Sequence, residues 1–89
     1  MRINQGFELR EMCGENIVIA TGVENIDFSK VISLNESAAY LWREVKDKEF
    51  TPATLAALLI TQYEVNEAVA MADATALANL WVTEGLAAE

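Results

Sequence analysis

The sequence predicts an α+β fold in which three β-strands are followed by three α-helices, as a single domain over residues 1–89. Apolar and polar side chains alternate in the first third of the chain, whereas apolar side chains recur at helical spacing after residue 35. A chain of 89 residues fits one domain, and a hydrophobic content of 53% is sufficient for a small core.

The first two strands are predicted to form a hairpin. Alternation over Phe7–Met12 is typical of a half-buried strand, and the β-branched run 17–19 follows the turn residues around Gly14. A third strand is predicted over Phe28–Leu34, where the alternation resumes with Lys30 on the apolar face. Three sequential strands form a meander, so the third strand should lie at an edge of the sheet.

The first helix is predicted to begin at Asn35, a side-chain acceptor that comes directly after a strand, and to end near Asp47. Its inward residues recur at i, i+3, i+4 and i+7: Ala38, Leu41, Trp42 and Val45. We interpret Asn35 mainly as a helix cap and Trp42 mainly as a core residue.

The second helix is predicted to begin at Thr51-Pro52, a capping residue followed by proline in the first turn. Its inward face should consist of four residues: Leu55, Leu58, Leu59 and Tyr63. Asn66 is expected to cap a third helix that runs to about Thr83 and ends at Gly85.

The third helix carries two apolar sets. One set falls within about 80° of the helical wheel and is expected to face the core: Val69, Ala72, Ala76 and Leu80. The other lies well round the helix, with Leu77 between the two sets: Ala70, Ala74, Ala78 and Trp81. Either alanine is simply favoured by its helix propensity, or this surplus apolar surface binds a partner.

The residue types present argue against catalysis. The chain has no histidine, so the common catalytic triads and most zinc sites are excluded. Its one cysteine, Cys13, lies among Glu11, Gly14 and Glu15, which favour an inert thiol. We therefore predict that the protein is not an enzyme and has no catalytic residue, metal site or cofactor.

The charge distribution restricts the partners. The net charge is −8, and no Lys or Arg follows Lys48. Nucleic acids and anionic membranes require cationic side chains, so neither is an expected partner. No apolar run is long enough to span a bilayer and no signal segment precedes the domain, which predicts a cytoplasmic protein.

Three motifs resemble those of the PqqD-like family, of the coenzyme PQQ synthesis protein D type. The segment Leu34-Asn35-Glu36-Ser37-Ala38-Ala39-Tyr40-Leu41-Trp42 is similar to the family signature at the start of the first helix. Tyr63-Glu64-Val65-Asn66 resembles the family's Tyr-x-Val-Asp, and 80–86 resembles its closing Leu-x-x-x-Gly-Leu. The motifs occur in the family's order and spacing and cover about Phe7 to Leu86.

The resemblance implies a winged-helix-like domain, with a three-stranded antiparallel sheet packed on three helices. It also implies a recognition element that captures the leader of a ribosomally made precursor peptide and presents it to a radical S-adenosylmethionine or other maturation enzyme. The leader would add as a strand beside the third strand and helix. The implied peptide-binding residues are Ser29, Lys30, Val31, Ile32, Ser33, Ala70, Asp73, Ala74, Leu77 and Trp81.

Other functions remain open. A self-associating or regulatory winged-helix module, including a homodimer, would use the same edge strand and alanine face. A DNA-binding regulator is disfavoured because the third helix offers acidic residues and alanine to a DNA groove. An acyl carrier protein would fit the acidic composition, but Glu36-Ser37-Ala38 matches poorly the Asp-Ser-Leu that carries phosphopantetheine. The peptide, its modification and the pathway are not specified by the sequence.

Overall fold

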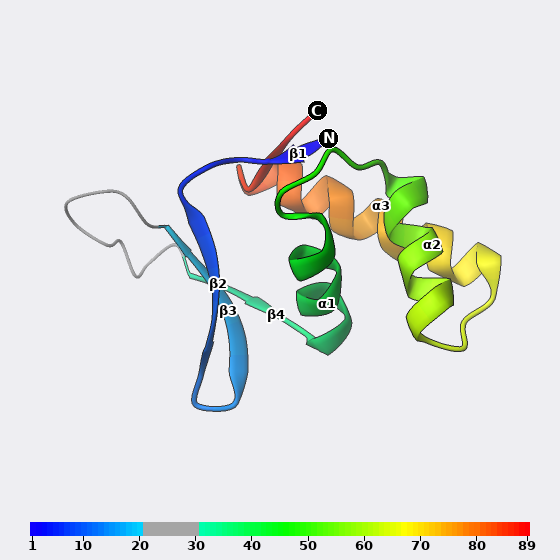
Figure 1. The fold of residues 1–89 in the computed structure, drawn as a ribbon, viewed down its shortest axis with the longest axis horizontal. Coiled ribbons are helices and arrows are strands. Elements are labelled where there is room, and N and C mark those ends of the chain that lie inside the picture. Colours follow the sequence, from blue (N-terminus) through cyan, green and yellow to red (C-terminus); the bar gives the residue numbers. More distant parts are fainter. Residues whose placement is uncertain (21–30) are drawn as a thin grey trace.

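The computed structural model describes residues 1–20 and 31–89 and confirms the predicted order of three strands and three helices (Figure 1). The strands of the main sheet are β2 (Phe7–Met12), β3 (Glu15–Ala20) and β4 (Ile32–Leu34). They are antiparallel and in the order β2-β3-β4, so β4 lies at an edge of the described sheet. Residues 28–30, predicted as the start of the third strand, lie outside the described residues.

The hairpin between β2 and β3 has the predicted turn. Cys13 and Gly14 separate the paired residues Met12 and Glu15. Both turn residues have positive φ, 53° and 79°, as the two central residues of a type I′ turn require. This turn type joins two strands with little distortion because its twist matches theirs.

A second, two-stranded sheet joins the two ends of the chain and was not predicted. β1 (Arg2–Ile3) pairs antiparallel with β5 (Ala87–Ala88) (Figure 1). Next to this pairing, Asn4 donates its backbone N–H to the Leu86 carbonyl at 2.8 Å and its side-chain Nδ2 to the Gly85 carbonyl at 2.9 Å. Strands of two residues are too short to show alternation, so the sequence contains no periodic signal for them.

The helices are α1 (Glu36–Val45), α2 (Pro52–Gln62) and α3 (Glu67–Thr83). The predicted caps are all present: Asn35 accepts from the backbone of Ala38, and Asn66 accepts from that of Val69, each at 2.8 Å. Thr51 and Thr54 form a reciprocal capping box. α1 ends at Val45, two residues before the expected end at Asp47.

The end of α3 is closed by a left-handed residue, as predicted. Gly85 has a φ of 76°, and its N–H donates to the Val82 carbonyl at 3.1 Å. The N–H of Leu86 reaches back to the Trp81 carbonyl at 2.8 Å. These two bonds form a Schellman motif, which satisfies carbonyls that the helix itself leaves free.

One core joins the sheet to the helices. The four inward residues predicted for α1 are all buried, including Trp42. In α2, Leu55 and Leu59 are buried, whereas Leu58 and Tyr63 are partly buried at the margin of the core. Because α1 contacts β2 and β4 on one side and α2 on the other, it connects the sheet to the remaining helices.

The predicted orientation of α3 is wrong. The set expected to face the core is exposed, with Val69 at 46% and Leu80 at 45%, whereas the second set is fully buried: Ala70, Ala74, Ala78 and Trp81. Trp81 explains the difference, because its ring has the largest apolar area on the helix and packs against Trp42. The buried alanines occur at a spacing of four on the same line, where small side chains let α3 lie close to α2.

Candidate functional site

No described strand pairs with the outer edge of β4, and the direction of the backbone groups there follows from the hairpin turn. In a type I′ hairpin the residues flanking the turn, here Met12 and Glu15, form a hydrogen-bonded pair, and such pairs alternate along an antiparallel ladder. Ile17 therefore bonds to β2, whereas Asn16 and Val18 direct their backbone groups toward β4.

The β3–β4 register then assigns the outward groups of β4. Asn16 is opposite Leu34 and Val18 is opposite Ile32, so these β4 residues bond to β3. Ser33 lies between them and directs its N–H and C=O away from β3, to the open edge. The same alternation gives Val31, the residue before the strand, the same direction.

A first cavity of about 370 Å³ lies where β4 ends, between the start of α1 and α3. Its apolar lining consists of Ala38, Leu41, Leu59, Ala76, Leu77 and Leu80. Asn35, Ser37 and Asp73 supply its polar groups. Three helices thus form an apolar recess beside the outgoing end of the edge strand.

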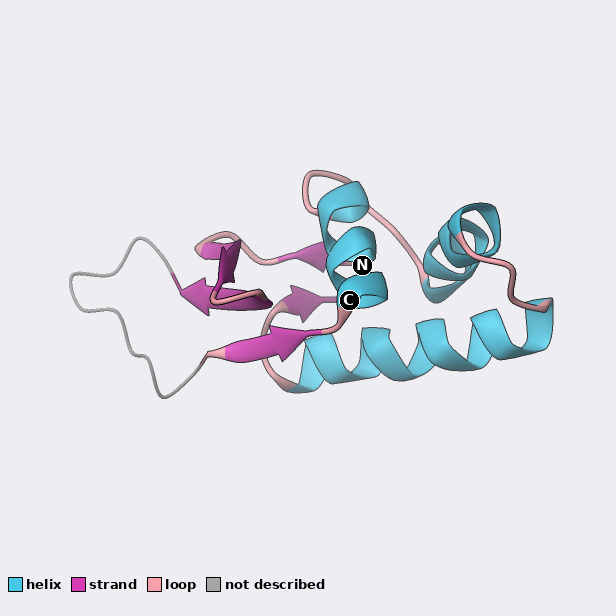
Figure 2. Cartoon of the chain, turned by 90° about the horizontal axis from the view of Figure 1, so that it is seen from below, coloured by secondary structure: helices cyan, strands magenta, loops and turns pink. Residues whose placement is uncertain are grey.

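A second cavity of about 520 Å³ lies at the other end of β4, where Val31 and Ile32 meet the end of α3. Its remaining described residues come from the β2–β3 pair and the turn after α3: Phe7, Ala20, Thr83, Glu84, Gly85 and Leu86. β4 and α3 run in opposite directions (Figure 2), so the two cavities follow one another along both elements. We call the two cavities and the β4 edge between them the β4–α3 groove.

The charged groups that the described residues contribute to this groove are acidic. Asp73 is the charged residue of the first cavity, and Glu84 is that of the second. Within residues 1–20 and 31–89, the ion pair formed is that of Arg10 with Glu8, at 3.2 Å, away from both cavities. The groove therefore combines apolar recesses with negative charge.

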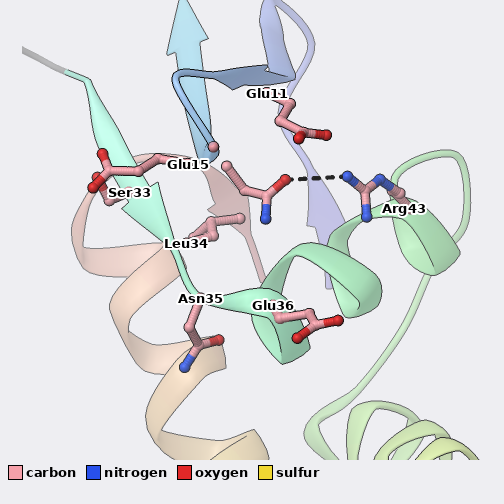
Figure 3. A pocket seen from close by; sticks show the side chains of 9 residues that line it. Glu11, Glu15, Ser33, Leu34, Asn35, Glu36 and Arg43 are labelled. Carbon is pink, nitrogen blue, oxygen red and sulfur yellow. Dashed lines mark hydrogen bonds between the residues drawn. The ribbon is translucent and has the colours of Figure 1, made fainter.

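A third cavity, of about 590 Å³, lies between the β2–β3 turn and α1 (Figure 3). Its carboxylates are Glu11, Glu15 and Glu36, and its one cation, Arg43, donates to Asn16 Oδ1 at 3.2 Å. Leu34 is its one large apolar residue. Because this cavity lacks an apolar floor, it is a weaker candidate for recognition than the β4–α3 groove.

Tyr40 and Tyr63 form an edge-to-face pair between α1 and the end of α2, with ring centroids 6.1 Å apart. Partial removal from water raises the pKa of the Tyr40 phenol, and the nearby Glu44 and Tyr63 raise it further. Neither tyrosine lines any of the three cavities, so the pair has a structural role.

The structure separates the predicted site residues into three groups. Val31 and Ile32 line the second cavity, Asp73 and Leu77 line the first, and Ser33 lies on the β4 edge and also lines the third cavity. Ala70, Ala74 and Trp81 have no exposed surface and belong to the core. Ser29 and Lys30 lie outside the described residues.

Several residues of the groove were predicted to belong to the core or to caps and turns. Ala76 and Leu80 line the first cavity, as do Asn35 and Ser37, while Glu84 lines the second. The sequence did contain a signal for Ala76 and Leu80, because both belong to one apolar stripe of α3. That stripe was predicted to face the core, whereas the structure exposes it.

The described residues show no grouping of three metal-ligating side chains, and none of their helices is long and apolar enough to cross a membrane.

The groove offers backbone hydrogen bonds, apolar recesses and two carboxylates. These are means of binding an extended chain, since strand addition uses free edge groups for affinity and recesses for side-chain choice.

Comparisons with known proteins agree with the fold. A solved structure described as TbiB1 in complex with the TbiA(beta) leader peptide matches with a TM-score of 0.72 and 12% sequence identity, over 100% of both chains. No curated protein sequence matches this one. The family model described as Coenzyme PQQ synthesis protein D (PqqD) matches residues 17–87, a range that includes most of β3, all of β4 and all three helices. The chain therefore belongs to the PqqD family, as its three motifs predicted.

Proposed function

We propose that this protein is a non-catalytic module that binds the leader segment of a ribosomally made precursor peptide and presents it to a modifying enzyme. The single observation that carries the proposal is the edge of β4 that no described strand covers, where Ser33 directs its backbone groups away from β3, between two cavities with apolar linings. Membership of the PqqD family supports it, as does the shared fold of TbiB1, which was solved with a leader peptide.

Binding occurs by strand addition. A peptide strand beside β4 forms hydrogen bonds with Ser33 and Val31, because these residues do not use their outward groups for β3. Its side chains then alternate between the two faces of the extended sheet, and those on the α3 side enter the groove.

The wall of the groove is the exposed stripe of α3. Leu77 and Leu80 supply apolar contact, Ala76 leaves space, and Asp73 supplies a carboxylate. The buried Ala70, Ala74 and Trp81 hold this helix in place rather than contact the peptide. The proposed peptide-binding residues are therefore Val31, Ile32, Ser33, Asp73, Ala76, Leu77 and Leu80.

The enzyme partner is a radical S-adenosylmethionine protein or another maturation enzyme, which receives the peptide while this module holds its leader. The leader and the enzyme bind at separate surfaces. The groove must therefore bind the peptide even when the enzyme is absent. A homodimer formed through the same edge is the alternative occupant, since a second β4 strand can pair there as well.

A chemical-shift titration tests the proposed site. The ¹⁵N-labelled protein is titrated with a synthetic peptide that covers the leader of the precursor encoded beside its gene. We expect shifts concentrated at Ser33, Leu77 and Leu80, with the hairpin turn around Gly14 unaffected. Saturable shifts confined to the hairpin and Arg43 would place binding at the third cavity and contradict the proposal. Sedimentation velocity without peptide identifies a homodimer.

A pair of proline variants tests the hydrogen bonds. Ser33→Pro removes an outward donor, so we expect a folded domain that binds the peptide more weakly by about 1 kcal/mol, or about fivefold. Ile32→Pro removes a donor to β3 and should instead lower the free energy of unfolding. Ser33→Ala keeps the N–H and is the matched control. A folded Ser33→Pro variant with unchanged peptide affinity would exclude strand addition.

A further inference from the structure

We infer that the groove selects peptides with two apolar anchor side chains four residues apart, one for each cavity. This inference rests on the proposed function and specifies which peptides the module accepts. It follows from the positions of the two cavities, at opposite ends of β4 and along one side of α3.

The strand gives one measure of their separation. Val31 lines the second cavity, and Asn35, which is still extended directly after β4, lines the first, so the two linings lie four residues apart along the extended chain. At a rise of about 3.3 Å per residue, four residues of an added strand span about 13 Å. An even spacing also places both side chains on the same face of that strand.

The helix gives an independent measure. On α3 the first cavity is centred near Ala76 and Leu77, and the second is centred near Glu84. This difference of seven to eight residues corresponds to about 11 Å at a helical rise of about 1.5 Å per residue. The strand and the helix therefore agree on a spacing of four, because a spacing of two would span only about 7 Å.

The lining determines the chemistry of the anchors. The first cavity is bounded by Leu41, Leu59 and Leu77, and the second by Phe7, Ile32 and Leu86. Among the residues that the structure describes, each lining has one charged member, and both of these are acidic: Asp73 and Glu84. An apolar side chain fits either cavity, whereas a peptide carboxylate would meet like charge and lose hydration.

Leu80 lies between the two cavities along α3. Among the α3 residues of the first cavity it is the nearest in the chain to Thr83 of the second, and it is 45% exposed. We expect a peptide residue midway between the anchors to lie near Leu80, on the same face of the strand. A small side chain is expected at that middle position.

Selection from a random peptide library displayed on ribosomes, with residues 1–89 as bait, tests the inference. We expect enriched peptides to share apolar residues at i and i+4, with acidic residues depleted at both. Ala76→Trp fills the first cavity and should abolish the requirement at one anchor only, and Thr83→Trp should do the same at the other. Ala68→Trp, exposed on the same helix but outside both cavities, is the matched control.

One enriched peptide is then resynthesised with a single residue inserted between its anchors. We expect affinity to fall about tenfold or more, since one anchor then points to the opposite face of the strand. Enriched peptides without an i, i+4 pair, or an insertion without effect, would overturn the two-anchor spacing alone. A selection that enriches no peptide would overturn the proposed function and the spacing with it.

Discussion

Trp81 packs edge-to-face against Trp42, with ring centroids 5.3 Å apart and ring planes at 84°. Phe50 contacts the same ring of Trp81 at 6.0 Å and 83°. These contacts join the end of α3 to α1 and to the segment before α2. Both tryptophans are at most 1% exposed, so this cluster determines which face of α3 turns inward and which face remains for the groove.

Trp81→Ala should therefore lower the free energy of unfolding by about 3–5 kcal/mol, the usual cost of removing a large buried aromatic side chain. Val69→Ala, at a position 46% exposed on the same helix, should change it by about 0.5 kcal/mol or less. Urea denaturation followed by circular dichroism measures both values. The reverse ranking would mean that α3 faces the core with the Val69 stripe.

Asn35→Ala should cost about 0.5–2 kcal/mol of stability, because it removes the acceptor of the Ala38 N–H at 2.8 Å. Asn35→Asp keeps an acceptor and is the control. Peptide affinity, measured by calorimetry on folded protein, should change much less than stability. If stability were unchanged while binding was lost, Asn35 would act in recognition through its place in the first cavity.

Gly85→Ala should lower stability by about 1–2 kcal/mol, the cost of a side chain in the left-handed region. An added Cβ meets no atom within 4 Å, so backbone strain is the whole effect. Gly85→Asn should cost less, since asparagine tolerates this conformation better. Thermal denaturation distinguishes the two variants. Equal losses for alanine and asparagine would point to a steric cause instead.

Duplex DNA should not bind, even at low ionic strength, because residues 49–89 contain no cation and the net charge is −8. Fluorescence anisotropy with a labelled duplex at about 50 mM salt measures this, since electrostatic binding is strongest there. Micromolar affinity that weakens steeply with added salt would revive the regulatory alternative.

Local rules predicted much of the fold. The caps at Asn35, Thr51 and Asn66 and the terminator at Gly85 depend on neighbouring residues alone, so the sequence contains the full signal. The inward face of α1 was also predictable, because that helix has one apolar stripe. The alternation in the first third predicted the order β2-β3-β4, whereas the site that the family motifs imply stays a prediction.

The face of α3 could not be predicted from periodicity. A helix with apolar residues on two sides has no unique inward direction, and the decision depends on the partners that Trp81 finds in Trp42 and Phe50. Because the predicted orientation exchanged the two faces of α3, groove residues such as Leu80 were predicted for the core, and core residues such as Ala74 were predicted for the binding site. The sequence also could not show which residues of β4 direct their backbone groups to the outer edge, because this depends on the register that pairs Ile17 with Ser33.

The β1–β5 pairing, which joins Arg2 to Ala88 and Ile3 to Ala87, has a consequence for the order of folding. Closing a loop of nearly the whole chain costs more entropy than forming the β2–β3 hairpin or the α2–α3 contact. We expect these terminal strands to pair after the rate-limiting step, so Ile3→Val should speed unfolding and leave the refolding rate nearly unchanged. Stopped-flow measurements in urea would show this as a shift of the unfolding limb alone; an equal shift of the refolding limb would contradict it. Late pairing would mean that the terminal strands slow the unfolding of a domain whose sheet and helices are already assembled.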